Sequence, residues 1–168
     1  MFPLLLALLF APLQAPPDLS GTWLLDAARS SAVGGGNGSG AGRGRVGGGG
    51  GLGLGPSAEE LTITQTPAAL SIVERRGTAT ARIVLTLDGK AATNAIAAGR
   101  NSGGTSSSTS VWKDRRLVTT VIAPAEPGSR ETVEYTEVRY LDADALVVEI
   151  TMKGSSNSRK TIYTRKRE

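Results

Sequence analysis

Side chains able to catalyse a reaction are sparse and poorly placed in this sequence. Its 168 residues include no histidine and no cysteine, which removes the commonest general base and the commonest zinc ligands. Glu59 and Glu60 are adjacent, so their carboxylates face opposite sides of a strand. Asp142 and Asp144 share a face, but aspartate there fits a hairpin turn. A carboxylate pair formed across two strands stays open. We predict no catalytic residue, metal site or cofactor.

A serine-rich run and a glycine-rich run could also be read as chemical motifs. The serine run 102–110 has no nucleophile elbow and no histidine to activate a hydroxyl. Residues 42–47, GRGRVG, match the dinucleotide-binding pattern, but that pattern needs a helix after it and further glycines follow here. Arg43 and Arg45 are too few, and lack the aromatic neighbours, for an RNA-binding segment. We interpret residues 34–55 as a mobile loop and predict no nucleic-acid partner.

The N-terminal segment has the features of an export signal. Residues 1–15, MFPLLLALLFAPLQA, form an apolar run of signal-peptide length. Ala15 offers the small residue needed before a cleavage site. No lysine or arginine precedes the run, and Pro16 would follow the cut, so a retained N-terminus or a misassigned start stays an alternative. We predict a signal peptide over 1–15, a periplasmic or secreted protein, and no stable membrane insertion after cleavage.

The remaining chain alternates apolar and polar residues with a period of two. This alternation and the turn residues between the runs predict strands over 20–26, 60–66, 69–76, 80–87, 105–113, 116–123, 129–141, 145–152 and 159–167. Asp88-Gly89 is a hairpin signal, and no window has a sustained helical period. The pattern predicts an all-β fold. Residues 16–168 are expected to form one antiparallel up-and-down β-barrel, a monomer, with the glycine-rich loop between its first two strands.

Residues 18–26, DLSGTWLLD, carry a family resemblance. Gly21-Thr22-Trp23 resembles the GxW opening of lipocalins, and GTWLL is similar to the opening of fatty-acid-binding proteins. LSGTWLLDAARS, followed by a glycine-rich stretch and LTITQ, resembles small exported bacterial lipocalin-like (calycin-type) domains of unassigned function. The resemblance implies a barrel with Gly21 and Trp23 as a structural motif and Trp23 filling one end. The TDY motif, C-terminal helix and cysteine pair of lipocalins and the two-helix lid of fatty-acid-binding proteins are missing.

The same resemblance gives two roles to the last strand, where Tyr163 and Arg165 share a face. In lipocalin-like barrels a basic residue of this strand packs across the GxW tryptophan, which assigns Arg165 to Trp23. In fatty-acid-binding proteins an arginine and a tyrosine two residues apart hold a ligand carboxylate, here in reversed order. Tyr163 and Arg165, together with Trp112, are the candidate ligand-binding residues.

Two functions remain open. The first is a non-enzymatic exported barrel that binds a small apolar or amphipathic molecule. The second is a filled barrel that acts as a structural or interaction module of the cell envelope. The small residues of 93–99 and 105–110, TNAIAAG and TSSSTS, would leave space inside a barrel, whereas a wall of large aliphatic side chains would fill it. Interior volume therefore separates the two functions.

Overall fold

The computed structural model describes residues 15–30, 57–96, 104–125 and 129–167. These ranges contain ten strands and no helix: β1 (Gly21–Leu25), β2 (Glu60–Gln65), β3 (Ala69–Arg76), β4 (Ala79–Thr86), β5 (Ala91–Ala95), β6 (Thr105–Lys113), β7 (Arg116–Pro124), β8 (Thr132–Asp142), β9 (Ala145–Met152) and β10 (Ser158–Arg165). The described part of the chain accordingly has no helix that could cross a membrane. The predicted glycine-rich loop 34–55 and nearly all of the predicted signal peptide lie outside the described residues.

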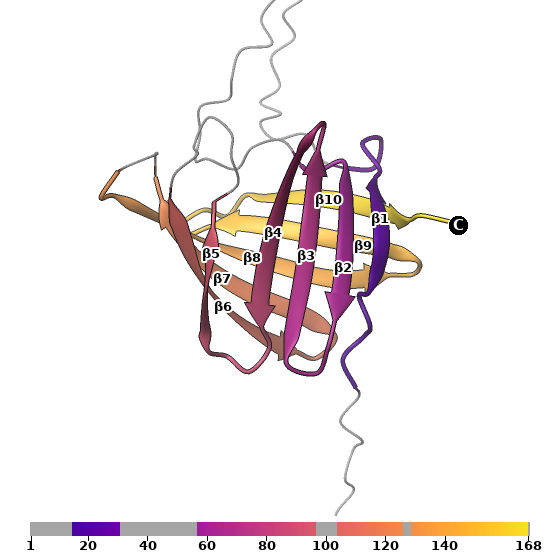
Figure 1. Ribbon diagram of the computed structural model, residues 1–168, viewed down its shortest axis with the longest axis horizontal. Coiled ribbons are helices and arrows are strands. Elements are labelled where there is room, and N and C mark those ends of the chain that lie inside the picture. Colours follow the sequence, from indigo (N-terminus) through magenta and orange to yellow (C-terminus); the bar gives the residue numbers. More distant parts are fainter. Residues whose placement is uncertain (1–14, 31–56, 97–103, 126–128, 168) are drawn as a thin grey trace, which may run out of the picture.

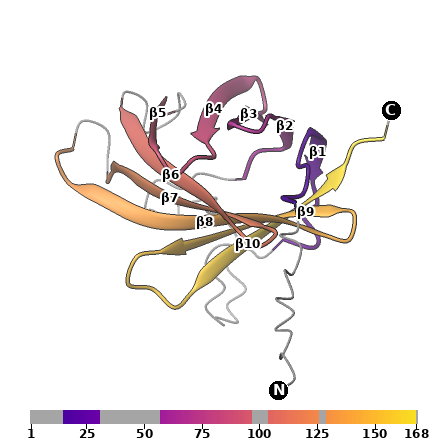
Figure 2. The same cartoon turned by 90° about the horizontal axis from the view of Figure 1, so that it is seen from below.

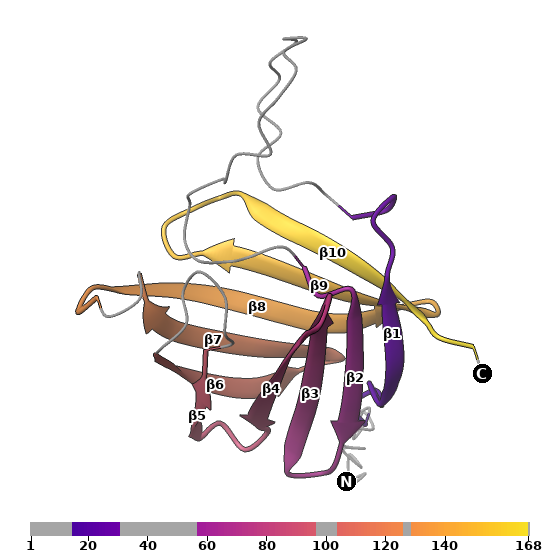
Figure 3. The same cartoon turned by 45° about the horizontal axis from the view of Figure 1, so that its top comes forward.

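All ten strands belong to one antiparallel sheet, in the order β4-β3-β2-β1-β10-β9-β8-β7-β6-β5. Each hydrogen-bonded pair joins strands that are consecutive in the chain, except that β1 pairs with β10 and places Trp23 opposite Arg165. In Figures 1 and 3, β1–β4 run steeply across β7–β10, so the sheet folds over into a nearly closed barrel. The prediction of an all-β, up-and-down antiparallel barrel is confirmed.

The two edge strands of the sheet, β4 and β5, meet along a seam (Figure 2). The side chain of Asn94 on β5 bridges this seam. Its Oδ1 accepts from the backbone nitrogen of Val84 on β4 at 2.7 Å, and its Nδ2 donates to the Val84 carbonyl at 2.9 Å. One carboxamide thus supplies at the seam the donor and acceptor that a neighbouring backbone supplies elsewhere.

The strand β5 was not among the predicted elements. Its sequence, AATNA, is alanine-rich, and alanine has a weak preference for strands. The strand forms because Ala91–Ala95 pairs along its whole length with Thr105–Thr109 of β6 and because Asn94 reaches β4. Tertiary pairing therefore overrides the local preference.

The interior is closed at one end and more accessible at the other. At the closed end Leu19, Trp23, Leu70 and Leu117 are at most 1% exposed. On β3, β4 and β9 the inward positions become more accessible toward the other end; on β3, exposure rises from 0% at Leu70 to 40% for the Arg76 side chain. We call the two ends the closed end and the open end.

Candidate functional site

A polar group lies on the inner face of β8. Tyr135, Glu137 and Arg139 alternate along this strand and therefore point to the same side. Arg139 lies between Leu117 of β7 and Val148 of β9, both buried in the barrel core. Only 4% of Arg139 is exposed. The strand therefore places a guanidinium between two buried apolar side chains.

Arg139 is only partly satisfied by its surroundings. One terminal guanidinium nitrogen forms an ion pair with Glu137, whose side chain is 12% exposed. The Nε and the other terminal nitrogen are buried and have no hydrogen-bond partner in the described part of the chain. An unpaired buried donor is costly, about 1–3 kcal/mol and more when it is charged. The guanidinium is thus placed to gain from an acceptor that enters the barrel.

Acidic and phenolic groups surround this guanidinium. Burial raises the pKa of Glu137, even though the charge of Arg139 opposes the shift, and the negative charge of Glu74 on β3 raises it further. Burial, followed by neighbouring carboxylates, raises the pKa of Tyr135 and of Tyr163 to about 12. Both phenols are therefore protonated at neutral pH and able to donate a hydrogen bond.

Small polar side chains line the wall formed by β5, β6 and β7. Three of the four inward residues of β6 are the serines Ser106, Ser108 and Ser110, the fourth is Trp112, and exposed residues alternate with them. Ser110 shares a hydrogen bond of 2.9 Å with Thr119 of β7, while Ser106 lies 3.5 Å from the Asn94 carbonyl. The inward residues of β2, β3 and β4, in contrast, are mainly leucine and isoleucine.

Apolar side chains on the inner face continue toward the open end. Ile150 of β9 and Ile83 of β4 are half-buried and pack against the core. Met152, the next inward residue of β9, is also half-buried and lies opposite Tyr135. The inner face thus carries a deep polar group and, nearer the open end, half-buried apolar side chains.

The structure places Arg165 over Trp23, as the resemblance to lipocalins predicts. The guanidinium carbon lies 4.5 Å from the centre of the indole ring, and the indole Nε1 donates to the Leu19 carbonyl at 3.0 Å. Arg165 is exposed while Trp23 is 1% exposed, so the guanidinium covers the closed end from outside.

Gly21 is required by this arrangement. Its φ of 135° is a conformation that residues with a side chain rarely adopt, and a Cβ there would lie 2.8 Å from a terminal nitrogen of Arg165. The first and third residues of the GxW pattern therefore act together: the glycine leaves room for the cation that stacks on the tryptophan.

The three candidate ligand-binding residues occupy different places. Tyr163 points inward, is 4% exposed and lies near enough to Glu74 and Glu137 for their charges to raise its pKa. Trp112 lies opposite Leu117, which in turn lies opposite Arg139, and it packs against the core. Arg165 lies at the closed end. Tyr163 and Trp112 thus flank the inner polar group, and a ligand contact for any of the three stays a prediction.

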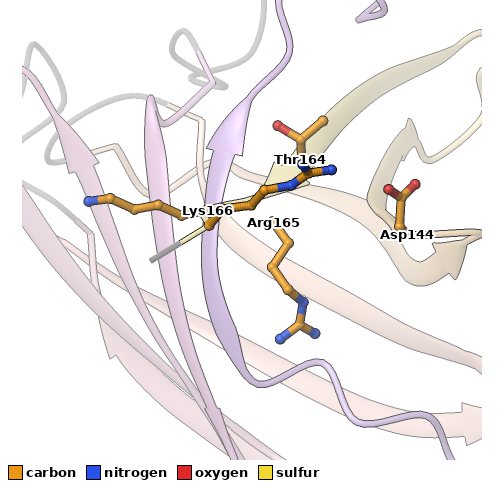
Figure 4. Close-up of a pocket in the computed structure, with 5 residues that line it drawn as sticks. Asp144, Thr164, Arg165 and Lys166 are labelled. Carbon is orange, nitrogen blue, oxygen red and sulfur yellow. The ribbon is translucent and has the colours of Figure 1, made fainter.

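A surface recess of about 490 Å³ lies beside the end of β10 (Figure 4). It is lined by Asp144, Thr164, Arg165, Lys166 and Arg167, all of them exposed. Figure 4 shows the side chains of Arg165 and Lys166 leaving the strand in different directions, and Lys166 lies 3.4 Å from Glu60. The recess is outside the barrel, whereas the buried unpaired donors are inside, so the interior is the candidate site.

Sequence reasoning did not identify Glu137 and Arg139. The segment 129–141 has polar and apolar residues on both of its alternating faces, so alternation does not tell which face is inside. The available signal was an in-phase glutamate and arginine two residues apart on a long strand. The described residues contain no group of acidic side chains suited to hold a metal ion.

No protein-family model and no curated protein matches the sequence. Among solved structures, the chain is similar to "REP1-NXSQ fatty acid transporter", with a TM-score of 0.59 and 15% identity over 89% of this chain and 97% of that chain. It is also similar to human cRBP IV, a cellular retinol-binding protein, with a TM-score of 0.55 and 19% identity over 90% of this chain and 100% of that chain. At these identities the likeness concerns the fold, which is that of a lipocalin-like, calycin-type barrel.

Proposed function

We propose that this barrel binds a small amphipathic molecule with an acidic head group and an apolar tail. The observation that carries the proposal is Arg139, a guanidinium 4% exposed, two of whose nitrogens lack a hydrogen-bond partner among the described residues. A carboxylate is the acceptor whose charge and shape suit a guanidinium best. The names of the two similar structures, a fatty acid transporter and a retinol-binding protein, support a lipophilic ligand.

The positions of polar and apolar side chains in the interior determine how the ligand is oriented. Its acidic head lies deep, next to Arg139, where the protonated hydroxyl of Tyr163 offers a second donor. Its tail runs toward the open end over Ile83, Ile150 and Met152. Burial of each methylene contributes about 0.8 kcal/mol, so the tail supplies most of the affinity and the guanidinium supplies selectivity for an acid.

The test compares long-chain fatty acids with the alcohols of the same length, by displacement of the anionic dye anilinonaphthalene sulfonate. The Arg139→Met/Glu137→Gln double variant removes both members of the buried pair together, which avoids an unpaired charge. It should lose roughly ten- to hundredfold in affinity for the acid, the value of a hydrogen bond to a charged group, and keep its affinity for the alcohol. The single variant Glu137→Gln retains the guanidinium and should bind the acid at least as tightly as wild type.

Arg82→Met is the matched control, because Arg82 lies exposed on the outer face of β4, where its Nε donates to the Ser71 hydroxyl at 3.2 Å. Equal affinity for acids and alcohols in the wild type would exclude Arg139 as the head-group site. Absence of binding for every acid and alcohol would reject the proposal and favour a filled barrel that acts as a structural or interaction module of the envelope.

The proposed role is carriage or storage of the ligand outside the cytoplasm, without catalysis. Export is supported by the apolar run of residues 1–15. Expression of the full chain and mass determination of the protein in the periplasm or medium should give a product that begins at Pro16. Recovery of the intact chain in the cytoplasm would refute export and leave the binding proposal to its own test.

A further inference from the structure

A second buried polar group inside the barrel has no hydrogen-bond partner among the residues that the structure describes. Ser108, on the inner face of β6, is 4% exposed, and its Oγ is buried without a hydrogen-bond partner in the described part of the chain. The inward serines on either side of it are engaged: Ser110 pairs with Thr119 and Ser106 lies at the Asn94 carbonyl. Ser108 is therefore the unsatisfied member of this hydroxyl row.

Ser108 is well separated from Arg139. It lies opposite Val121 of β7, four residues along that strand from Leu117, which lies opposite Arg139 on β8. Two strand spacings and four residue steps put the two Cα atoms roughly 16 Å apart along the sheet. Ser108 is the nearer of the two to the open end. A molecule whose head lies at Arg139 would pass Ser108 along its length and not at its head.

We infer that the ligand carries a hydroxyl group near the middle of its apolar part, and that Ser108 recognises it. This inference rests on the proposed function and narrows the ligand to a hydroxylated amphipathic acid. A plain alkyl chain would leave the serine hydroxyl buried and unpaired, whereas a ligand hydroxyl can both donate to it and accept from it. A site built to bond a hydroxyl discriminates against the analogue that lacks it.

The experiment measures the affinity of the wild type for stearic acid and for a set of stearic acids that carry one hydroxyl at successive mid-chain carbons. At least one hydroxylated acid should bind about fivefold more tightly than stearic acid, as expected for one hydrogen bond. In Ser108→Ala this preference should disappear. The thermal unfolding midpoint of the free variant should not fall, because the variant removes a buried hydroxyl that had no partner.

Ser107→Ala is the matched control, since Ser107 is the exposed neighbour on the opposite face of β6; it should keep the preference. Binding of stearic acid with no preference for any hydroxylated form, or a preference that survives in Ser108→Ala, would overturn the inference and leave the proposed function standing. Failure of the wild type to bind any of the acids would overturn both.

Discussion

At the scale of single residues, the contact of Arg165 with Trp23 makes a measurable contribution to stability. An exposed cation over an aromatic face is worth about 0.5–1 kcal/mol, and the guanidinium lies 4.5 Å from the ring centre. Arg165→Ala and Trp23→Phe, made singly and together and unfolded in urea, should therefore show a coupling energy of that size. Strict additivity of the two changes would mean that the two side chains do not interact in solution.

Gly21→Ala should destabilise the barrel by about 1–3 kcal/mol, because the φ of 135° is strained for any residue with a Cβ. The nearest obstacle to a Cβ, at 2.8 Å, is the mobile end of the Arg165 side chain, and that end can move away. The loss of stability caused by Gly21→Ala should consequently persist when this change is made in the Arg165→Ala background. Full recovery there would show that crowding, and not backbone strain, is the cause.

Glu137 should make stability depend on pH. Its pKa in the folded protein is raised above the ordinary value of 4.5, so its contribution is complete below pH 4.5 and is lost as the pH rises through the folded pKa. The free energy of unfolding of the wild type, minus that of Glu137→Gln, should fall over this range. Carboxyls with a lowered pKa, such as Glu60, are present in both proteins, so their pH-dependent contributions cancel in this difference. A difference that increases with pH would mean that Arg139 stabilises the ionised form more than burial destabilises it.

At the scale of elements, the seam between β4 and β5 depends on Asn94. Asn94→Ala would leave the nitrogen and carbonyl of Val84 without this partner, which should cost about 1–3 kcal/mol and speed hydrogen exchange at the Val84 amide. Asn94→Asp retains an acceptor for the Val84 amide but no donor for the Val84 carbonyl. Hydrogen exchange at the Val84 amide in this variant should therefore be intermediate between wild type and Asn94→Ala. Thr93→Ala, at the exposed neighbour on β5, is the control. Unchanged exchange at Val84 in Asn94→Ala would show that other contacts close the seam.

Sequence predicts an element well where one face is clearly apolar. Leu61 and Ile63 alternate with threonines, and the strand over 60–66 was found; Ala91–Ala95 has no such contrast, so β5 was missed. The same limit applies to the site. Gly21 and Trp23 were identified from a short motif, and Arg165 from the resemblance of the last strand to that of lipocalin-like barrels. Arg139, by contrast, lies on a strand with mixed faces, and its burial depends on β7 and β9.

At the scale of the whole molecule, the first and last of the ten strands are not the edges of the sheet. They pair with each other as β1 and β10, whereas the sheet edges are β4 and β5. A circular permutant that links Arg167 to Asp18 and opens the chain at Gly89 would make every hydrogen-bonded strand pair consecutive. Because local pairing speeds folding, this permutant should fold faster than wild type in stopped-flow measurements.

A permutant with the same link but opened at Gly154 is the control, because it separates β9 from β10 in sequence and so restores one long-range pair. It should fold more slowly than the permutant opened at Gly89. Equal folding rates for the two would show that closure of the β1–β10 pair does not limit folding.

The pairing of β1 with β10 also determines how the barrel responds to force. The start of β1 lies beside the end of β10. The backbone nitrogen of Lys166 donates to the Thr22 carbonyl at 2.8 Å, and Trp23 lies opposite Arg165. Tension applied through these two ends would load the rungs of an antiparallel ladder one after another, so the strands would peel apart and not slide past each other. The stacked guanidinium lies at the first rungs to be loaded. Trp23 is one of the most deeply buried side chains of the folded barrel, at 1% exposed. Under tension it is therefore among the first side chains to become exposed.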